Sequence, residues 1–599
     1  MITHCVASEN AEHPCPFSVS DEEARIRVKL PKKLIVCCDG TWMDSDNGWV
    51  KGKWGQPGHL QNPTNVTRIV RAIASEDKAH HPQIVYYQAG VGTGIGLYNQ
   101  VVGGGTGLGL AENVREAYAF IASNYAEHDR LVPNDSIFLI GFSRGAYTAR
   151  TLGGFICAMG ILKRHAMPHF YEIFEDWNHA GDPHYEPMFF RSYFKHHKDV
   201  KPIWPCEGLA KSKKHRDAYL QEYFQMLQNL NMTQRASINC IGVWDTVGAL
   251  GIPVNPIFQR LFPFLSSFVR TYRWFDTRLD SLVKNAFHAL ALDERRFPYY
   301  PAMWERTQGC TSNLQQVWFP GAHSNIGGSY EDAGIANITL AWMMDQLAGN
   351  TMKRPEDFRR HDWIQFDDEL LDTWYDCTSD WVEDHKNSSY KGWARGKIYD
   401  SNTFPQSLAG QKTRLPGRYH GTFYESGNED PHRLLEDTNE YIHSSVRARI
   451  DMGGNGVEAD SKKVFPNGLS LTPLLTSLWR RLTGRTVSTY QPQNRKQPLH
   501  GWRLEDGHKS HEEPNWDIDM SPDGSAHEVT WVFEGDGKVT KRTMPEARLG
   551  RYERYLLQKD QELADKIEFT NAGWKWTMKE EERPQKRGRT WPFADACRM

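Results

Sequence analysis

The 599-residue sequence contains no uninterrupted run of 18 apolar residues, so it predicts no transmembrane helix. Its first residues, MITHCVASENAEHPCPF, lack the basic stretch followed by an apolar stretch that marks a secretory signal peptide. The ten cysteines form no CxxC pair and no Cys/His cluster at zinc spacing. Together these absences predict a reduced, cytoplasmic protein that needs no metal.

A strong charge of one sign is also missing. The formal net charge is −3, from 71 basic and 74 acidic residues, which does not favour nucleic acid as a partner. The glycine-rich stretch at 92–110 contains neither a GxGxxG nor a Walker A pattern, and we interpret it as a loop packed closely against backbone. We therefore expect no nucleotide cofactor. The sequence leaves the oligomeric state open.

What the chain has is an alternation of apolar runs and amphipathic stretches. Because the strand-like runs are apolar throughout, they are typical of a parallel sheet buried on both faces. We predict an α/β fold: a doubly wound, mostly parallel sheet with helices on both faces, a lid-like insertion and a mixed C-terminal extension. The predicted strands cover 33–40, 83–91, 135–143, 236–251 and 314–328, and the predicted helices cover 66–76, 111–125, 144–162 and 334–347.

The composition changes along the chain and suggests four parts. Residues 1–31 are polar and are expected to form a disordered leader, and residues 32–348 form the catalytic domain. Within that domain, 163–235 is rich in His, Lys and aromatic residues, and we predict a lid inserted over one end of the sheet. Residues 349–577 form an accessory region packed on the catalytic domain, with a β-like pair at 527–544, and 578–599 form a charged tail.

The segment GFSRG places Ser143 between an apolar strand and a helix, the context of a nucleophile elbow. Gly141 and Gly145 leave room for the sharp turn, since a side chain at either position would collide with the neighbouring strand or helix. The helix start also presents unpaired N–H groups, so the N–H of Arg144 is a candidate oxyanion donor. The alternative is an ordinary serine that packs between strand and helix.

Candidate partners for Ser143 follow in the order serine, acid, histidine. Asp245 stands at the end of one predicted strand and His323 at the end of another, so both are expected at the same sheet edge as Ser143. His323 would accept the serine proton, and Asp245 would orient the imidazole. Asp245 could instead cap the following turn, and Asp293 is a rival acid unless it pairs with a neighbouring arginine.

The first predicted strand ends on the same edge, at Asp39. The backbone N–H of Gly40 or Thr41 could supply a second oxyanion donor there. Asp39 itself would then serve to hold the loop.

Seven blocks of the sequence resemble the catalytic domain of type VI secretion system phospholipase effectors, an α/β-hydrolase domain also widespread in fungi. The resemblance covers residues 32–348, and RLPGRY (414–419) and EYIHSSVRAR (440–449) continue it more weakly. It implies a serine esterase or lipase acting on phospholipids, with the triad at Ser143, Asp245 and His323. Asn325 stands where the family often has Asp. The blocks are LIVCCDGTW…NPTNV, YYQAGVGTG, GTGLGLAENVREAYAFI, IFLIGFSRGAYTARTLGGFI, GVWDTVGALG, HALALDERRF and VWFPGAHSNIGGSY.

We therefore expect a serine hydrolase that cleaves carboxylic esters of lipids. Two segments, 255–274 and 468–485, carry apolar residues at helical spacing with arginines nearby, which would allow peripheral contact with a membrane. The alternative for both is a helix packed in the core. Two other functions stay open: a non-catalytic scaffold with the same fold, and a hydrolase of non-lipid esters or thioesters.

Overall fold

The computed structural model describes residues 30–40, 49–50, 59–60, 62–90, 108–126, 134–182, 184–197, 215–247, 277–351, 363–367, 370, 373, 376, 392–399, 401, 411–420, 433–452, 497–506, 529–570 and 573–577. Residues 1–29 of the predicted leader, both amphipathic segments (255–274 and 468–485) and the charged tail lie outside these residues. Within the described ranges, none of the helices combines the length and apolar character that crossing a bilayer requires.

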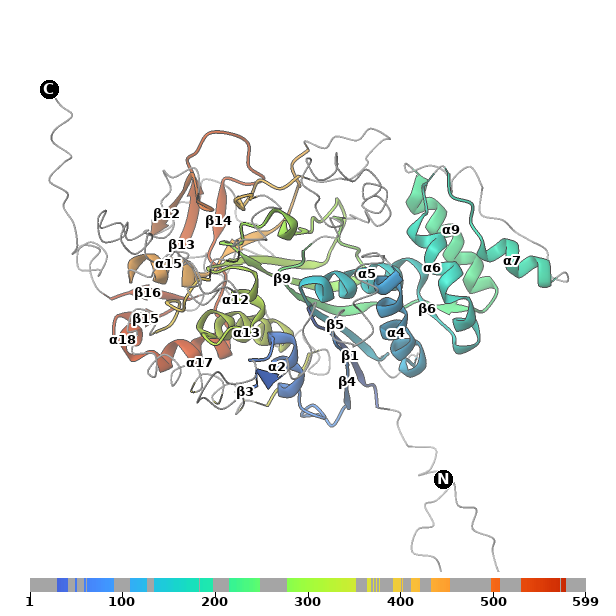
Figure 1. Ribbon diagram of the computed structural model, residues 1–599, viewed down its shortest axis with the longest axis horizontal. Coiled ribbons are helices and arrows are strands. Elements are labelled where there is room, and N and C mark those ends of the chain that lie inside the picture. The colour runs from blue at the N-terminus through green and yellow to red at the C-terminus, as the bar shows by residue number, and fades with distance from the viewer. Residues whose placement is uncertain are drawn as a thin grey trace, which may run out of the picture.

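A seven-stranded sheet forms the centre of the molecule (Figure 1). Its strand order is β11-β10-β9-β8-β5-β1-β4, and every neighbouring pair is parallel. This confirms the predicted α/β-hydrolase-like, doubly wound sheet. The strands are β1 (Lys33–Cys38), β4 (Gln83–Gln88), β5 (Ser136–Phe142), β8 (Ile238–Trp244), β9 (Val283–Ala291), β10 (Asn313–Phe319) and β11 (Glu440–Ile442).

Helices cover both faces of this sheet because successive strand residues point to opposite sides. In β5, Leu139 joins the hydrophobic core beneath α4 (Leu108–Asn124) and α5 (Ser143–Met159). Its neighbour Ile140 joins the core beneath α2 (Asn65–Ala72) and α13 (Gly334–Leu347). The apolar runs in the sequence therefore reflect strands that are buried on both faces.

The chain changes direction in the sheet between β1 and β5. From β1 it moves outward to β4, and it then returns to β5 on the other side of β1. In open parallel sheets, ligands bind at such a switch point, beyond the carboxyl ends of the strands. Ser143 follows β5 directly at this point, and Asp39 follows β1.

The predicted insertion begins at the other end of the sheet, near the amino ends of the strands. It begins at β6 (Ile161–Leu162) and returns at β7 (Thr233–Gln234), which pair with each other just before β8 starts. Ser143 lies at the other end of the 17-residue helix α5, a length of about 25 Å. Between β6 and β7 lie η1 (Arg164–His169), α6 (Phe170–Asn178), α7 (Phe189–His196) and α9 (Arg216–Asn229).

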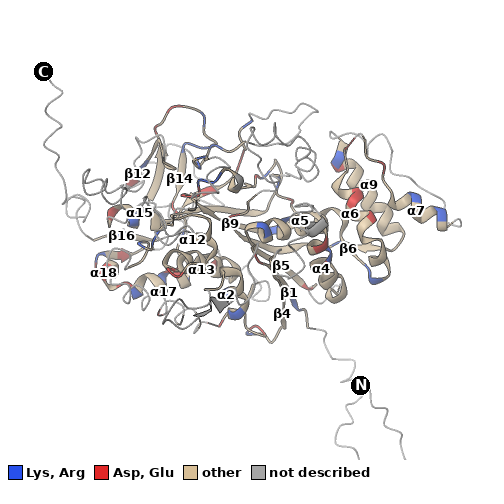
Figure 2. Cartoon of the chain, in the orientation of Figure 1, with Lys and Arg blue, Asp and Glu red and all other residues tan. Residues whose placement is uncertain are grey.

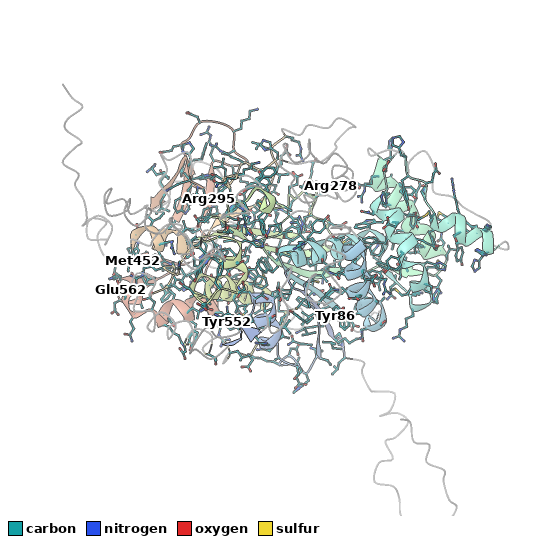
Figure 3. The ribbon with its side chains drawn as sticks, viewed as in Figure 1. Tyr86, Arg278, Arg295, Met452, Tyr552 and Glu562 are labelled. Carbon is teal, nitrogen blue, oxygen red and sulfur yellow. The ribbon has the colours of Figure 1, made fainter. Side chains whose placement is uncertain are left out.

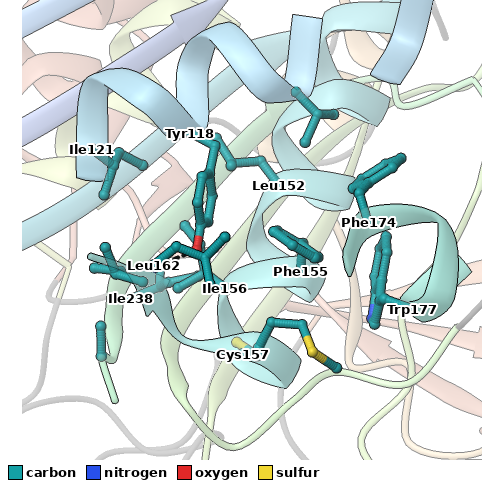
Figure 4. Packing of buried hydrophobic residues seen from close by; sticks show 14 of the residues in the cluster. Tyr118, Ile121, Leu152, Phe155, Ile156, Cys157, Leu162, Phe174, Trp177 and Ile238 are labelled. Atoms are coloured by element: carbon teal, nitrogen blue, oxygen red, sulfur yellow. Dashed lines mark hydrogen bonds between the residues drawn. The ribbon is translucent and has the colours of Figure 1, made fainter. Parts of the chain in front are cut away.

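Aromatic packing holds these helices at the far end of α5. Phe155 of α5 contacts the rings of Phe174 and Trp177, with centroids 5.4 and 5.3 Å apart (Figure 4). It also contacts the ring of Phe170, at 5.4 Å. The described part of the insertion therefore does not lie over Ser143, unlike the predicted lid. Sequence composition indicates an insertion, but it does not show whether the insertion lies near the amino or the carboxyl ends of the strands.

Polar contacts add a second attachment for the insertion. Arg278, labelled in Figure 3, donates from Nη1 to Oδ2 of Asp217 in α9 at 2.7 Å and from Nη2 to Oδ1 at 3.1 Å. Figure 2 shows both basic and acidic residues on this group of helices.

The accessory region is continuous with the catalytic domain. It contributes β11, the seventh strand, and α17 (Arg551–Lys559) packs against α13. The central sheet therefore extends across the predicted boundary near residue 348. The predicted β-like pair corresponds to β13 and β14, which are antiparallel. The remaining elements are β2 (Trp49–Val50), β3 (His59–Leu60), η3 (Phe297–Tyr299), α12 (His323–Gly327), α15 (Ser444–Asp451), β12 (Trp502–Asp506), β13 (Val529–Phe533), β14 (Thr543–Pro545), α17 (Arg551–Lys559), α18 (Gln561–Ala564), β15 (Ile567–Phe569) and β16 (Trp574–Trp576).

Candidate active site

Ser143 stands on a sharp turn between β5 and α5. Its φ angle is 58°, a left-handed conformation that residues other than glycine seldom adopt. A Cβ at Gly145 would collide with the backbone carbonyl oxygens of Cys38 and Asp39, and one at Gly141 would lie 2.6 Å from the carbonyl oxygen of Gly145. The two glycines thus permit close packing of strand and helix, and the strained turn projects the serine from the sheet edge.

The structure brings Ser143, His323 and Asp245 together in one hydrogen-bonded line. His323 Nε2 lies 2.7 Å from Ser143 Oγ, and His323 Nδ1 lies 2.6 Å from Asp245 Oδ2. The two partners of His323 are 180 and 78 positions away in the sequence. Asp245 follows β8 directly, and His323 begins α12 shortly after β10. Parallel strands ending at one edge account for this meeting.

The three side chains differ in exposure and charge. Asp245 is wholly buried, whereas Ser143 is 7% exposed and His323 is 4% exposed. Burial alone would raise the pKa of Asp245, but Arg414 and His323 together hold that pKa well below its usual range. Burial lowers the pKa of His323, and Asp245 opposes only part of that effect. An ionised Asp245 beside a neutral His323 is the state in which the imidazole can accept a proton.

Asp245 has a second ionic partner in Arg414, a residue of the accessory region. The Arg414 guanidinium donates from Nη1 to Oδ1 at 2.5 Å and from Nη2 to Oδ2 at 3.0 Å. No role was predicted for Arg414 from the sequence. The signal was the RLPGRY block, which begins at this arginine.

Aromatic and acidic groups surround His323. The rings of Phe142 and Tyr299 lie 4.7 and 4.8 Å from the imidazole, centroid to centroid. The backbone N–H of His323 donates to Glu294 Oε2 at 3.3 Å, and Glu294 in turn accepts from the side chain of Arg296. No role beside His323 was predicted for these groups from the sequence, although the HALALDERRF block contains Glu294 and Arg296.

The rival acid Asp293 has a different position. Its Oδ2 accepts the N–H of Gly321 at 2.7 Å, and its own N–H donates to the Gly321 carbonyl. Asp293 thereby fixes the turn that precedes His323, while His323 Nδ1 is bonded to Asp245. Asn325 supports the same turn, since its Oδ1 accepts the N–H of Ala322 at 3.1 Å. The geometry favours Asp245 over Asp293.

The predicted oxyanion donors differ in their surroundings. Arg144 is the second residue of α5, so its N–H belongs to the first turn and has no acceptor within the helix. The N–H of Gly40 donates to Asp39 Oδ1 at 2.7 Å, and an oxyanion would have to compete with that carboxylate. Thr41 lies outside the described residues.

Asp39 has the loop-holding contacts expected of it. Its Oδ2 accepts hydrogen bonds from Thr64, Thr67 and Tyr87 at 2.7–3.1 Å. In the part of the chain that the structure describes, no group of three His, Cys, Asp or Glu residues is placed to hold a metal ion.

Comparisons with known proteins agree with the resemblance seen in the sequence. The family model for the type VI secretion system phospholipase effector Tle1-like catalytic domain matches residues 32–346. An uncharacterized protein of Saccharomyces cerevisiae, YEL023C, is 23% identical over 302 residues, which cover 46% of this chain and 34% of the yeast protein. The chain therefore spans about a third of that relative's length.

A solved structure, the Tle1 effector bound to the VgrG spike of a type VI secretion system, is 18% identical, with a TM-score of 0.24. The similarity covers 51% of this chain and 52% of the effector chain. Because the family model matches more than half of the sequence, the chain belongs to the family of Tle1-like phospholipase effector catalytic domains.

Proposed function

We propose that this protein is a serine hydrolase that cleaves carboxylic esters of lipids, with phospholipids as the substrate class. The observation that carries the proposal is the line Ser143–His323–Asp245, joined by contacts of 2.7 and 2.6 Å at a strained elbow. Membership of a phospholipase-like family supports the lipid substrate. A cytoplasmic location and peripheral contact with membranes are further parts of this proposal.

The reaction follows from the positions of the atoms. Ser143 Oγ attacks the ester carbonyl carbon while its proton passes to His323 Nε2, and Asp245 stabilises the imidazolium. The carbonyl oxygen becomes an oxyanion that the N–H of Arg144 can bind. His323 then gives its proton to the leaving alcohol, which leaves an acyl group on Ser143. Water, deprotonated by His323, attacks this acyl-enzyme. The bond between the acyl carbon and Ser143 Oγ then breaks, His323 returns the proton to Oγ, and the carboxylic acid is released.

The first experiment tests whether Ser143 is the nucleophile. A fluorophosphonate probe should label the wild-type protein and should not label Ser143→Ala. Ser445→Ala is a matched control, because Ser445 also lies within hydrogen-bond distance of a histidine, His443, at 2.7 Å. Equal labelling of the Ser143→Ala variant would exclude Ser143 as the nucleophile. No labelling of folded wild-type protein would refute the proposed serine hydrolase.

A second experiment identifies the substrate class. The wild-type protein and Ser143→Ala should be compared on phospholipid vesicles, acylglycerols and short water-soluble esters. We expect Ser143-dependent release of fatty acid from phospholipids. Hydrolysis of short esters alone would keep the serine chemistry and refute the lipid substrate.

A further inference from the structure

We propose that Arg414 is a positioning residue for the hydrolytic reaction and that it fixes the carboxylate of Asp245 against His323. This inference rests on the proposed function and adds a residue to it. Arg414 lies well beyond residues 32–346, the part that matches the family's catalytic domain. The accessory region would then complete the active site instead of only packing beside it.

The contacts of Arg414 fix its guanidinium on two sides. Its two terminal nitrogens each donate to a different oxygen of Asp245, at 2.5 and 3.0 Å. The same nitrogens donate to the carbonyl oxygens of Ala291, at the end of β9, and of Tyr299, in η3, at 2.8 and 2.5 Å. A planar guanidinium held in this way can define the plane of the carboxylate, which a lysine ammonium cannot do.

Asp245 has little freedom left in this arrangement. Besides the two bonds from Arg414, its Oδ1 accepts the N–H of Ala291 at 3.1 Å, and its Oδ2 faces His323 Nδ1 at 2.6 Å. A rotation of the carboxylate would therefore break contacts to Arg414 and Ala291 as well as the contact to His323. Because a misplacement of about 1 Å can cost about 10²-fold in rate, this restraint affects catalysis directly.

Charge gives Arg414 a second effect. Both Arg414 and Asp245 are buried, and a buried carboxylate without a cation would favour its protonated form. A neutral Asp245 could no longer stabilise the imidazolium of His323. Further charged or titratable groups act on this set: Glu294 and Arg296 follow β9, and His288 lies within it. Tyr300 follows η3, and Tyr419 lies on the segment of Arg414 itself.

The chain offers a matched control in Arg447. Its Nε and Nη2 donate to the two oxygens of Glu546 at 2.9 Å each, and Nη2 also donates to the carbonyl of Trp574 at 3.0 Å. Arg447 is therefore a second buried arginine with a forked carboxylate contact and a carbonyl contact, in the same accessory region. It is bonded to groups outside the Ser143–His323–Asp245 line.

The experiment compares Arg414→Lys and Arg414→Ala with Arg447→Lys and Arg447→Ala in the full chain, with thermal unfolding measured for all four. For Arg414→Lys we expect kcat to fall by about 10²-fold with KM nearly unchanged, because orientation is lost while the charge stays. Arg414→Ala should lose more, and millimolar guanidinium ion should restore part of its kcat. Arg447→Lys should keep its kcat even where its thermal stability falls.

The pH profile of kcat/KM adds a readout that a purely structural role would not change. In Arg414→Ala the limb at acid pH should move, while in Arg447→Ala it should stay in place. Equal kcat for the two lysine variants, or a loss in Arg414→Ala that guanidinium does not restore, would overturn the positioning role. Activity that survives in Ser143→Ala would instead overturn the proposed function, so the two failures can be told apart.

Discussion

Among the residues that the structure describes, two hydrogen-bonded lines join a serine, a histidine and a carboxylate. In the first, His323 lies 2.7 Å from Ser143 and 2.6 Å from Asp245. In the second, His443 lies 2.7 Å from Ser445 and 2.7 Å from Glu553. Distances alone therefore do not distinguish the proposed catalytic set from the other one.

Position and access distinguish them. Ser143 stands on a strained elbow at the switch point of the sheet and is 7% exposed, whereas Ser445, His443 and Glu553 are at most 1% exposed. The ring is also reversed, since Ser143 faces Nε2 of its histidine and Ser445 faces Nδ1. A substrate carbonyl cannot reach a serine enclosed in the core. We therefore interpret the second line as a structural hydrogen-bond network.

The acids differ in their electrostatic surroundings. Arg414 holds the pKa of Asp245 low, whereas burial raises the pKa of Glu553 well above its usual range. Glu553 and the neighbouring Asp345 serve the start of α17: Glu553 accepts the N–H of Gly550, and Asp345 accepts those of Tyr552 and Glu553. The first line therefore has an acid that a neighbouring arginine keeps ionised, whereas burial favours the protonated acid in the second line.

The largest expected effect comes from replacing the two acids. Asp245→Asn should lower kcat by about 10⁴-fold, because an amide at this position favours the wrong tautomer of His323. Glu553→Gln should leave kcat within about threefold, since Gln mimics the neutral form of a buried acid. Steady-state hydrolysis of the best ester substrate measures both values.

Asp293→Asn is the control for the first replacement, because Asp293 is bonded to Gly321 in the turn before His323. We expect it to cost stability more than kcat. If Asp293→Asn abolished activity and Asp245→Asn did not, the assignment of the acid would be reversed.

A smaller effect is expected when the elbow itself is altered. Gly145→Ala places a methyl group against the carbonyl oxygens of Cys38 and Asp39, so β1 and α5 must move apart. Overpacking of this kind costs about 1–3 kcal/mol of the free energy of unfolding, and the shift should also slow labelling of Ser143 by a fluorophosphonate. Urea unfolding and labelling rates measure the two consequences.

Gly573→Ala is the matched control, since no heavy atom lies within 4 Å of the Cβ it would add. It should change neither measurement. Unchanged labelling in Gly145→Ala would mean that the close packing at the elbow is not needed to present the serine.

The sequence predicted the elbow and its partners because each stands at the end of a long apolar strand. The helix at 334–347 was predicted with the bounds that α13 has, because a mostly apolar run of 14 residues is too long for a typical strand. The strand β11 has only three residues, which is too short to carry a period. Arg414 lies in irregular chain 169 positions from Asp245, so spacing could not connect the two residues.

The smallest expected effect concerns the pH dependence of stability and arises from the second line. Burial, together with Glu553, raises the pKa of Asp345 to about 8, and burial raises that of Glu553 as well. The folded state therefore holds protons that the unfolded chain releases above about pH 4. The contribution of these two acids to the free energy of unfolding should therefore be complete at about pH 4 and below, and it should be lost as the pH rises toward about 8. Asp245, whose pKa is lowered, makes its opposite contribution below about pH 4 and does not disturb this range.

The variant Glu553→Gln tests whether these buried acids cause the loss of stability at rising pH. Gln cannot ionise, so the variant removes one titrating group from this buried pair of acids. Between about pH 5 and 8.5, the melting temperature of the variant should decline less steeply than that of the wild type, and the two curves should differ most at the alkaline end. Parallel curves over that range would show that Glu553 keeps the same charge in the folded and unfolded states. The contrast with Asp245 would then lie in access and geometry alone, because both acids would be ionised in the folded protein.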